Sequence, residues 1–236
     1  MLIKTRGIVL KAIKYSESSL ILDVYTESKG LRKYIISGVR NKRSRLKIGV
    51  LRPASLIDLV AYHRDHKPMN RIKEIKAAHI YQTVPFELFK GTISLFMTEL
   101  IQKTVKEEEA NPELFEFLFD QYVRLDEQPQ LDPNHHLRFM LELTRYLGFF
   151  PGGGWSEETP WLDLRDGVFS RLEPLHQYSA NQRISQQIGQ LLRHETPELN
   201  RQDRHRLLDK LVDYYRLHVE NFNGLNTHEI LREVME

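Results

Sequence analysis

The sequence predicts an α+β protein, in which a small β-barrel precedes an all-α region. Three observations favour this fold class. In residues 6–80, short apolar stretches alternate every second residue; from residue 85 onward, apolar residues recur at helical spacing; and no low-complexity linker separates the two regions. We expect a domain at 1–80, and a helical domain at 81–236 with an irregular insert at about 149–178.

Five short strands are expected in the first region. Ser19–Tyr25 alternates, and a turn at Glu27–Gly30 links it to a second strand from Gly30 to Val39. Another strand is expected after Pro53, and the last strand covers Ile72–Ile80. Closure into a barrel removes exposed strand edges. The five-stranded candidate is an OB-fold, whose open face and loops commonly bind oligonucleotides.

Helix signals mark the second region. Asn111-Pro112-Glu113 combines a capping side chain, a proline at the first helical position and an acid in the first turn. Asp132-Pro133 repeats the start signal, and Gly148 suits a C-terminal cap. The insert is expected to hold a small hairpin around Asp166-Gly167.

Charge is distributed unevenly along the chain. Residues 1–80 carry 18 Lys and Arg against 6 Asp and Glu, whereas residues 81–236 carry 16 against 26. Within the basic part, Ser28–Ile57 holds nine cations and no acid. Such asymmetry is typical of a region that contacts nucleic acid or another anionic surface.

We therefore expect a nucleic-acid interface on the barrel. The side chains predicted to contact phosphates are Arg32, Lys33, Arg40, Lys42, Arg43, Arg45 and Lys47. Tyr34 is a candidate for stacking on one base, and the alternative for this ring is the barrel core. For the cluster from Arg40 to Lys47 the alternative is a solvated turn. Either DNA or RNA would satisfy this charge pattern.

Other functional classes have little support. The sequence has no Cys, which excludes disulfides and thiolate metal sites, and neither His63/His66 nor His135-His136 comes with a third ligand. No nucleophile motif is present, and Ser28–Ile57 has no carboxylates to hold Mg²⁺ for a nuclease. We expect no enzyme activity, cofactor or metal. No apolar run is long enough for a membrane helix, and Met1–Gly7 does not read as a secretory signal, so we expect a cytoplasmic protein.

The acidic helical region is a candidate for protein contacts. A groove between helices suits a short peptide, and exposed arginines suit an acidic one. The candidates are Arg138, Arg145, Arg204 and Arg206. Solvated helix faces are the alternative.

Several segments together resemble the RecO family of bacterial recombination mediators. They are Thr5–Leu10, Tyr15–Leu20, Ser37–Ser44, Leu51–Pro53, Phe139–Pro151, Leu207–His218 and Leu231–Val234. The resemblance spans nearly the whole chain and depends on order, length and spacing rather than on one diagnostic motif.

The resemblance implies an N-terminal OB-fold and a helical C-terminal domain. It implies binding of single- and double-stranded DNA and annealing of complementary strands near the nucleoid. It also implies partnership with RecR and with the acidic tail of single-strand-binding protein, so that RecA is loaded at gaps. Some members carry a four-Cys zinc element after the segment matching Gly148–Pro151; here Gly152-Gly-Gly-Trp155 stands there, and the metal is not expected.

Overall fold

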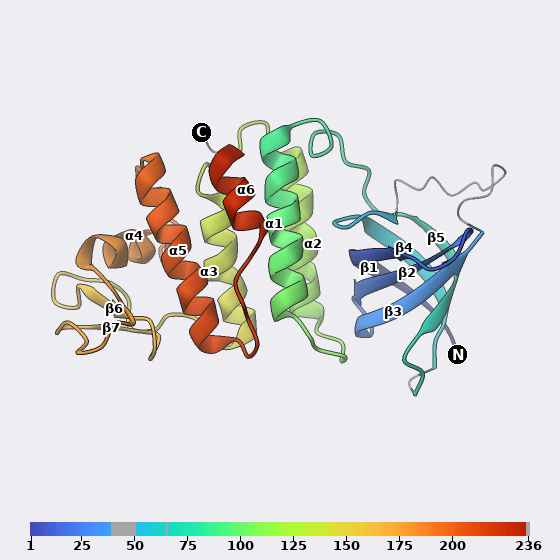
Figure 1. The fold of residues 1–236 in the computed structure, drawn as a ribbon, viewed down its shortest axis with the longest axis horizontal. Coiled ribbons are helices and arrows are strands. Elements are labelled where there is room, and N and C mark those ends of the chain that lie inside the picture. Colours follow the sequence, from blue (N-terminus) through green and yellow to red (C-terminus); the bar gives the residue numbers. More distant parts are fainter. Residues whose placement is uncertain (39–50, 65, 235–236) are drawn as a thin grey trace. The chain divides into compact units, whose positions relative to one another are not determined.

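A computed structural model describes residues 1–38, 51–64 and 66–234 (Figure 1). The chain divides into two compact units, Met1–Pro129 and Gln130–Glu236. The first unit contains a β-barrel and two helices, and the second contains four helices and a small sheet. Whether residues 1–80 and 81–236 behave as separate domains stays a prediction.

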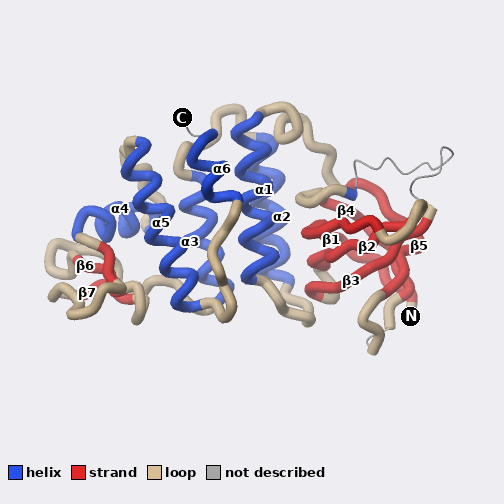
Figure 2. Tube along the Cα trace, viewed as in Figure 1, coloured by secondary structure: helices blue, strands red, loops and turns tan. Residues whose placement is uncertain are grey.

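The first five strands form a closed barrel, which confirms the predicted fold class (Figure 2). They are β1 (Leu2–Lys14), β2 (Ser19–Thr26), β3 (Gly30–Ser37), β4 (Leu56–Tyr62) and β5 (Asn70–Ala77). The order around the barrel is β1-β2-β3-β5-β4, and β4 pairs back onto β1. Every pair is antiparallel except β3–β5, which is parallel. This is the connectivity of an OB-fold.

Alternating side chains fill the barrel. Leu22 and Val24 of β2 and Tyr34 and Ile36 of β3 belong to one buried cluster with residues of the other strands. Leu51, which lies just before β4, is part of the same cluster. Successive residues of a strand point to opposite faces, and the residues between these are therefore presented on the outside of the barrel.

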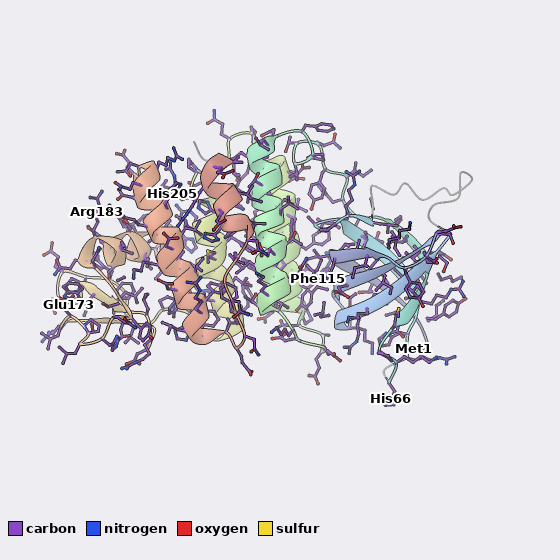
Figure 3. The ribbon with its side chains drawn as sticks, viewed as in Figure 1. Met1, His66, Phe115, Glu173, Arg183 and His205 are labelled. Carbon is purple, nitrogen blue, oxygen red and sulfur yellow. The ribbon has the colours of Figure 1, made fainter. Side chains whose placement is uncertain are left out.

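Two helices complete the first unit: α1 (Leu88–Thr104) and α2 (Pro112–Glu127), which lie side by side (Figure 1). The predicted start of α2 is confirmed, since the Asn111 side chain accepts a hydrogen bond from the Leu114 N–H at 3.1 Å. Phe115 points from α2 toward the barrel (Figure 3), where it stacks on Tyr25 with ring centroids 6.2 Å apart. The Arg6 guanidinium lies over the rings of Phe115 and Phe119.

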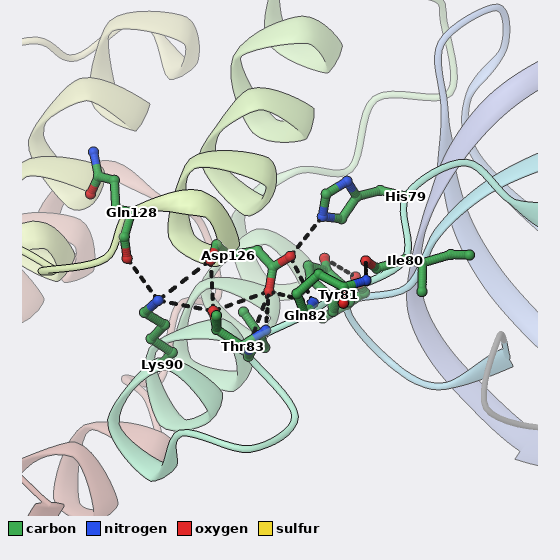
Figure 4. A network of polar contacts seen from close by, with 10 residues as sticks. His79, Ile80, Tyr81, Gln82, Thr83, Lys90, Asp126 and Gln128 are labelled. Carbon is green, nitrogen blue, oxygen red and sulfur yellow. Dashed lines mark hydrogen bonds and ion pairs between the residues drawn. The ribbon is translucent and has the colours of Figure 1, made fainter.

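A buried carboxylate ties the segment that follows the barrel to the end of α2 (Figure 4). Asp126 accepts backbone N–H donors from Gln82, Thr83 and Val84 at 2.8–3.1 Å, and its Oδ2 lies 2.9 Å from the His79 ring. Burial alone would raise the pKa of this carboxyl, but the backbone donors lower it well below its usual range. The Asp126 carboxylate is thus an anion held by the backbone.

The second unit combines helices and a three-stranded sheet. Its helices are α3 (His135–Leu147), α4 (Gln182–Leu192), α5 (Arg201–His218) and α6 (Thr227–Val234), and its strands are β6 (Trp161–Asp163), β7 (Val168–Ser170) and β8 (Ser179–Ala180). The hairpin predicted around Asp166-Gly167 is confirmed as β6–β7. Gly148 caps α3 in the left-handed conformation, as predicted. Within the described residues, no helix is both long and apolar enough to cross a membrane.

Candidate nucleic-acid interface

The outer face of β1, β2 and β3 carries an apolar row. Because Leu22 and Tyr34 belong to the barrel core, the residues that alternate with them point outward. Strand register pairs Ile13 with Ile21, and Ile21 with Ile35. The outer face of a barrel is ordinarily polar, so three isoleucines side by side form an unusual surface.

Charged residues border this row. Lys11 of β1 pairs with Asp23 of β2, which in turn pairs with Lys33 of β3. At the other side of β3, Arg71 of β5 pairs with Ile35. Lys11, Lys33 and Arg71 are exposed. The face therefore offers apolar surface flanked by cations, which suits a ligand that has flat apolar groups on an anionic backbone.

A groove of about 270 Å³ adjoins the charged row. Its walls include Asp23, Arg32, Lys33, Lys67, Pro68 and Glu108. Lys67 and Pro68 come from the loop between β4 and β5, which also carries His66 at its tip (Figure 3). In an OB-fold, this loop and the face of strands 2 and 3 are the usual oligonucleotide-binding surface.

Arg32 and Lys33 both line the groove, but their surroundings differ. Lys33 is exposed, whereas the Arg32 side chain is 18% exposed and paired with Glu108, its Nη1 lying 2.9 Å from Oε2. Arg32 also donates to the Glu108 backbone oxygen. Glu108 belongs to the loop between α1 and α2, so an acid from the helical hairpin reaches the basic groove.

Tyr34 requires a correction. Its side chain has no exposed surface and lies in the barrel core, where burial raises the pKa of its hydroxyl to about 12. A base has no access to a ring in this position, so the stacking role predicted for Tyr34 is wrong. The reason is register: Tyr34 pairs with Leu22, another inward residue. Tyr15 and Tyr62 are the tyrosines of the barrel that are exposed among the described residues.

The other five predicted phosphate ligands, Arg40, Lys42, Arg43, Arg45 and Lys47, lie outside the described residues. The described residues on either side are attached to the barrel. Gly38 directly follows β3, and Leu51 is buried in the core cluster. Ala54 donates its N–H to the Val9 oxygen, and Val9 donates to Ser55. That these five residues bind nucleic acid stays a prediction.

Lys67 was not among the residues predicted from the sequence. The prediction weighted local density of charge, and Lys67 is the single Lys or Arg of residues 66–69. A signal was nevertheless present, because these residues belong to the β4–β5 loop of an OB-fold. Lys11 and Arg71 were missed because their position on the face depends on strand register, which a charge count does not contain.

The four arginines predicted to contact protein partners lie on two helices of the second unit. Arg138 and Arg145 are on α3, and Arg204 and Arg206 are on α5. Arg138 pairs with Asp132 at 2.8 Å, Arg145 lies 3.8 Å above the Phe150 ring, and Arg204 donates to the Leu199 oxygen. Arg206 is exposed. Their role in partner binding stays a prediction.

Two family models match this chain, one after the other. The model described as recombination protein O N terminal covers residues 1–81, which include the whole barrel. The model described as recombination protein O C terminal covers residues 85–152. The chain belongs to the recombination protein O family.

Relatives of similar length support the same assignment. The chain is 33% identical to a DNA repair protein RecO of Phocaeicola vulgatus and 33% identical to one of Flavobacterium psychrophilum, with 99% of each chain covered in both comparisons. It is 32% identical to a DNA repair protein RecO of Bacteroides fragilis over the full length of both chains. The family resemblance stated from the sequence is thus confirmed.

The zinc element of some RecO proteins does not fit the residues of this chain. The segment after Pro151 contains no cysteine, and among the described residues no three His, Asp or Glu side chains gather at a point where they would hold a metal ion. Hydrogen bonds and packing order this segment instead. Gly152 bonds with Gly167 and Phe169, and Trp155 packs so closely on α4 that a Cβ at Gly189 would lie 2.3 Å from it.

Proposed function

We propose that this protein binds DNA through the outer face and groove of its barrel and acts as a recombination mediator in DNA repair. The observation that carries the proposal is the groove in which Lys33 of β3 and Lys67 of the β4–β5 loop meet, beside the isoleucine row. This surface belongs to an OB-fold, in a family whose relatives are named DNA repair proteins.

The cations of the groove suit the phosphates of single-stranded DNA, and the isoleucine row suits its bases. Lysine and arginine neutralise phosphates and release counterions, which makes the affinity dependent on salt and nearly independent of sequence. Unpaired bases expose flat apolar faces, which the row of Ile13, Ile21 and Ile35 is placed to cover. Bases in a duplex are already stacked, so this row favours single-stranded DNA.

Annealing follows from the same physics and needs no nucleophile. Two complementary strands repel one another through their phosphates, and bound cations reduce that repulsion. The cations of the groove supply such charge, and the basic segment from Arg40 to Lys47 adds to it.

The proposed partners are proteins that meet DNA at single-stranded gaps. The acidic tail of single-strand-binding protein and RecR are the direct partners, and RecA is loaded as a consequence. The support is family membership and the arginines of α3 and α5, of which Arg145 and Arg206 are exposed. A pull-down with the acidic C-terminal peptide of single-strand-binding protein tests this part: an Arg138, Arg145, Arg204 and Arg206 to Ala variant should capture less peptide, and unchanged capture would contradict the residue assignment.

The DNA-binding part is tested by removing Arg40, Lys42, Arg43 and Arg45 together. Their replacement by Ala should weaken binding to labelled single-stranded DNA, slow strand annealing and flatten the salt dependence, while circular dichroism stays unchanged. The matched control replaces Arg165, Arg171, Arg193 and Arg216 by Ala, which removes the same charge from exposed positions of the second unit. Equal loss of affinity in both variants would mean that net charge alone governs binding.

An RNA-binding OB-fold protein is the alternative. Competition between DNA and RNA oligonucleotides of the same sequence discriminates between them. Preference for RNA at physiological salt would contradict the proposal.

A further inference from the structure

The loop between α1 and α2 brings acidic residues to a basic groove. Its sequence, Lys106-Glu-Glu-Glu109, follows the end of α1, and Glu108 is part of the groove wall that holds Arg32, Lys33 and Lys67. The three cations attract an anion to this place, and in the folded chain the Glu108 carboxylate is already there. Any phosphate that enters the groove therefore meets a resident competitor.

The position of Glu108 is set by backbone contacts on both sides. The Leu31 N–H donates to the Glu107 oxygen at 2.8 Å, which attaches the loop to the start of β3. Gly30 has a φ of +61°, and a Cβ there would lie 2.3 Å from the Glu109 oxygen. The loop thus rests directly on β3, one residue before Arg32. The Glu108 side chain contributes nothing to these contacts.

The contacts between Glu108 and Arg32 use the donors that a phosphate would use. Arg32 directs Nη1 to the Glu108 carboxylate at 2.9 Å and Nη2 to the Glu108 backbone oxygen. A guanidinium binds phosphate with the same pair of parallel N–H groups. A DNA phosphate can therefore take the Nη1 donor of Arg32 only after the carboxylate has moved away, while Nη2 stays bonded to the Glu108 backbone oxygen.

Moving the Glu108 carboxylate away from Arg32 requires little free energy. The Glu108 side chain is 80% exposed, so water and salt screen its ion pair with Arg32 and keep it weak. The carboxylate is already largely hydrated in the pair, so its hydration changes little when it leaves Arg32. The carboxylate can therefore give way to a phosphate and pair with Arg32 again when the phosphate leaves.

We propose that Glu108 is an internal competitor of DNA, which occupies Arg32 in place of a backbone phosphate and weakens binding in the groove. This inference rests on the proposed DNA-binding function. It identifies a residue that sets affinity and release, outside the barrel that supplies the cations.

The test compares Glu108→Gln with Glu109→Gln, which removes the same charge one residue further along the loop. Binding to labelled single-stranded DNA is measured by fluorescence anisotropy at several salt concentrations. Glu108→Gln should tighten binding by about two- to fivefold. It should also steepen the dependence of log K on log salt by about 0.7, the value for one added phosphate contact on a single strand. Glu109→Gln should change both much less.

A double-mutant cycle with Arg32→Gln assigns the effect to the pair. If Glu108 acts through Arg32, Glu108→Gln has no effect in the Arg32→Gln background. Arg32→Met, which keeps a long side chain without the charge, replaces it if Arg32→Gln loses its folded circular dichroism spectrum. Equal tightening by Glu108→Gln and Glu109→Gln, or tightening that persists without Arg32, would overturn the proposal.

The failures of the two proposals are distinct. A wild-type protein that binds DNA with a clear salt dependence, together with a silent Glu108→Gln variant, overturns the competitor and leaves the DNA-binding function standing. A wild-type protein without DNA affinity overturns the proposed function and the competitor with it.

Discussion

Arg32 and Lys33 are adjacent in the chain but serve different purposes in the free protein. Lys33 projects into the groove from the outer face of β3, whereas Arg32 holds the α1–α2 loop through Glu108. Their charge was visible in the sequence and led to both being predicted as phosphate ligands. The partner of Arg32 lies 76 residues away, and no local pattern of charge contains that contact.

Tyr34 illustrates the same limit for aromatic residues. Strand alternation divides β3 into two faces, but it does not say which face is the core until the partner strands are known. Leu22 and Asn70, which pair with Tyr34 on either side, decide the question in favour of the core. The sequence predicted the strand correctly and left the orientation of this ring open.

His136 gives a prediction at the scale of one side chain. The residue lies fully buried on α3, where burial and then the nearby His135 lower its pKa to about 3. The unfolded value is about 6.5. The folded state therefore holds His136 neutral, so its contribution to stability is complete above about pH 6.5 and is lost as the pH falls toward 3.

Urea denaturation between pH 7.5 and 4.5 measures this loss. The free energy of unfolding should fall by up to about 1.4 kcal/mol per pH unit from this group in that range. His136→Leu should remove that part of the slope, whereas His66→Gln, at an exposed histidine, should keep it. Identical pH dependence in wild type and His136→Leu would contradict the assignment.

At the scale of elements, the sequence predicts local features, such as helix ends and hairpins, better than the long-range contacts that attach one element to another. The Asn111 cap, the left-handed Gly148 and the β6–β7 hairpin depend on residues close in sequence, and all three are confirmed. The segment that follows the barrel, residues 79–84 (the exit segment), is attached to α2 through Asp126, which lies more than 40 residues from its partners. Nothing in the local sequence around Asp126 distinguishes it from a solvated acid on a helix.

Asp126→Asn tests that attachment. The substitution replaces an anion that accepts several backbone N–H groups with a neutral amide, one side of which is itself a donor. We expect a loss of about 2–4 kcal/mol in the free energy of unfolding, because buried donors lose a charged acceptor. Chemical denaturation measures it, with Asp120→Asn at an exposed position of the same helix as control. Equal stability of the two variants would show that the network adds nothing.

At the scale of the molecule, the barrel of the first unit is bonded to the helical hairpin formed by α1 and α2. Arg6 of β1 bonds Glu27 at 2.8 Å and also contacts Glu116 of α2, and its guanidinium covers two phenylalanine rings. The α1–α2 loop bonds to β3 and Asp126 holds the exit segment. These contacts, among others, join the barrel and the helical hairpin within residues 1–129.

We therefore expect a fragment of residues 1–129 to unfold in one cooperative transition and to bind single-stranded DNA with the salt dependence of the full chain. A fragment of residues 1–80 loses these attachments and should be less stable, since Tyr25 also loses the Phe115 ring that covers it. Urea denaturation of the two fragments makes the comparison. Equal stability would show that the barrel is a domain independent of the hairpin.

The central claim is that the groove binds DNA phosphates. Its most direct test is the salt dependence of single-stranded DNA binding by wild type and by the Lys33→Gln/Lys67→Gln double variant. Lys4→Gln/Lys76→Gln serves as control, because those lysines line another pocket of the barrel that also contains Asp58 and Glu74. The groove variant should bind more weakly, and its slope of log K against log salt should be shallower by about 1.4, the value for two lost phosphate contacts. An affinity and a slope equal to those of wild type would contradict it.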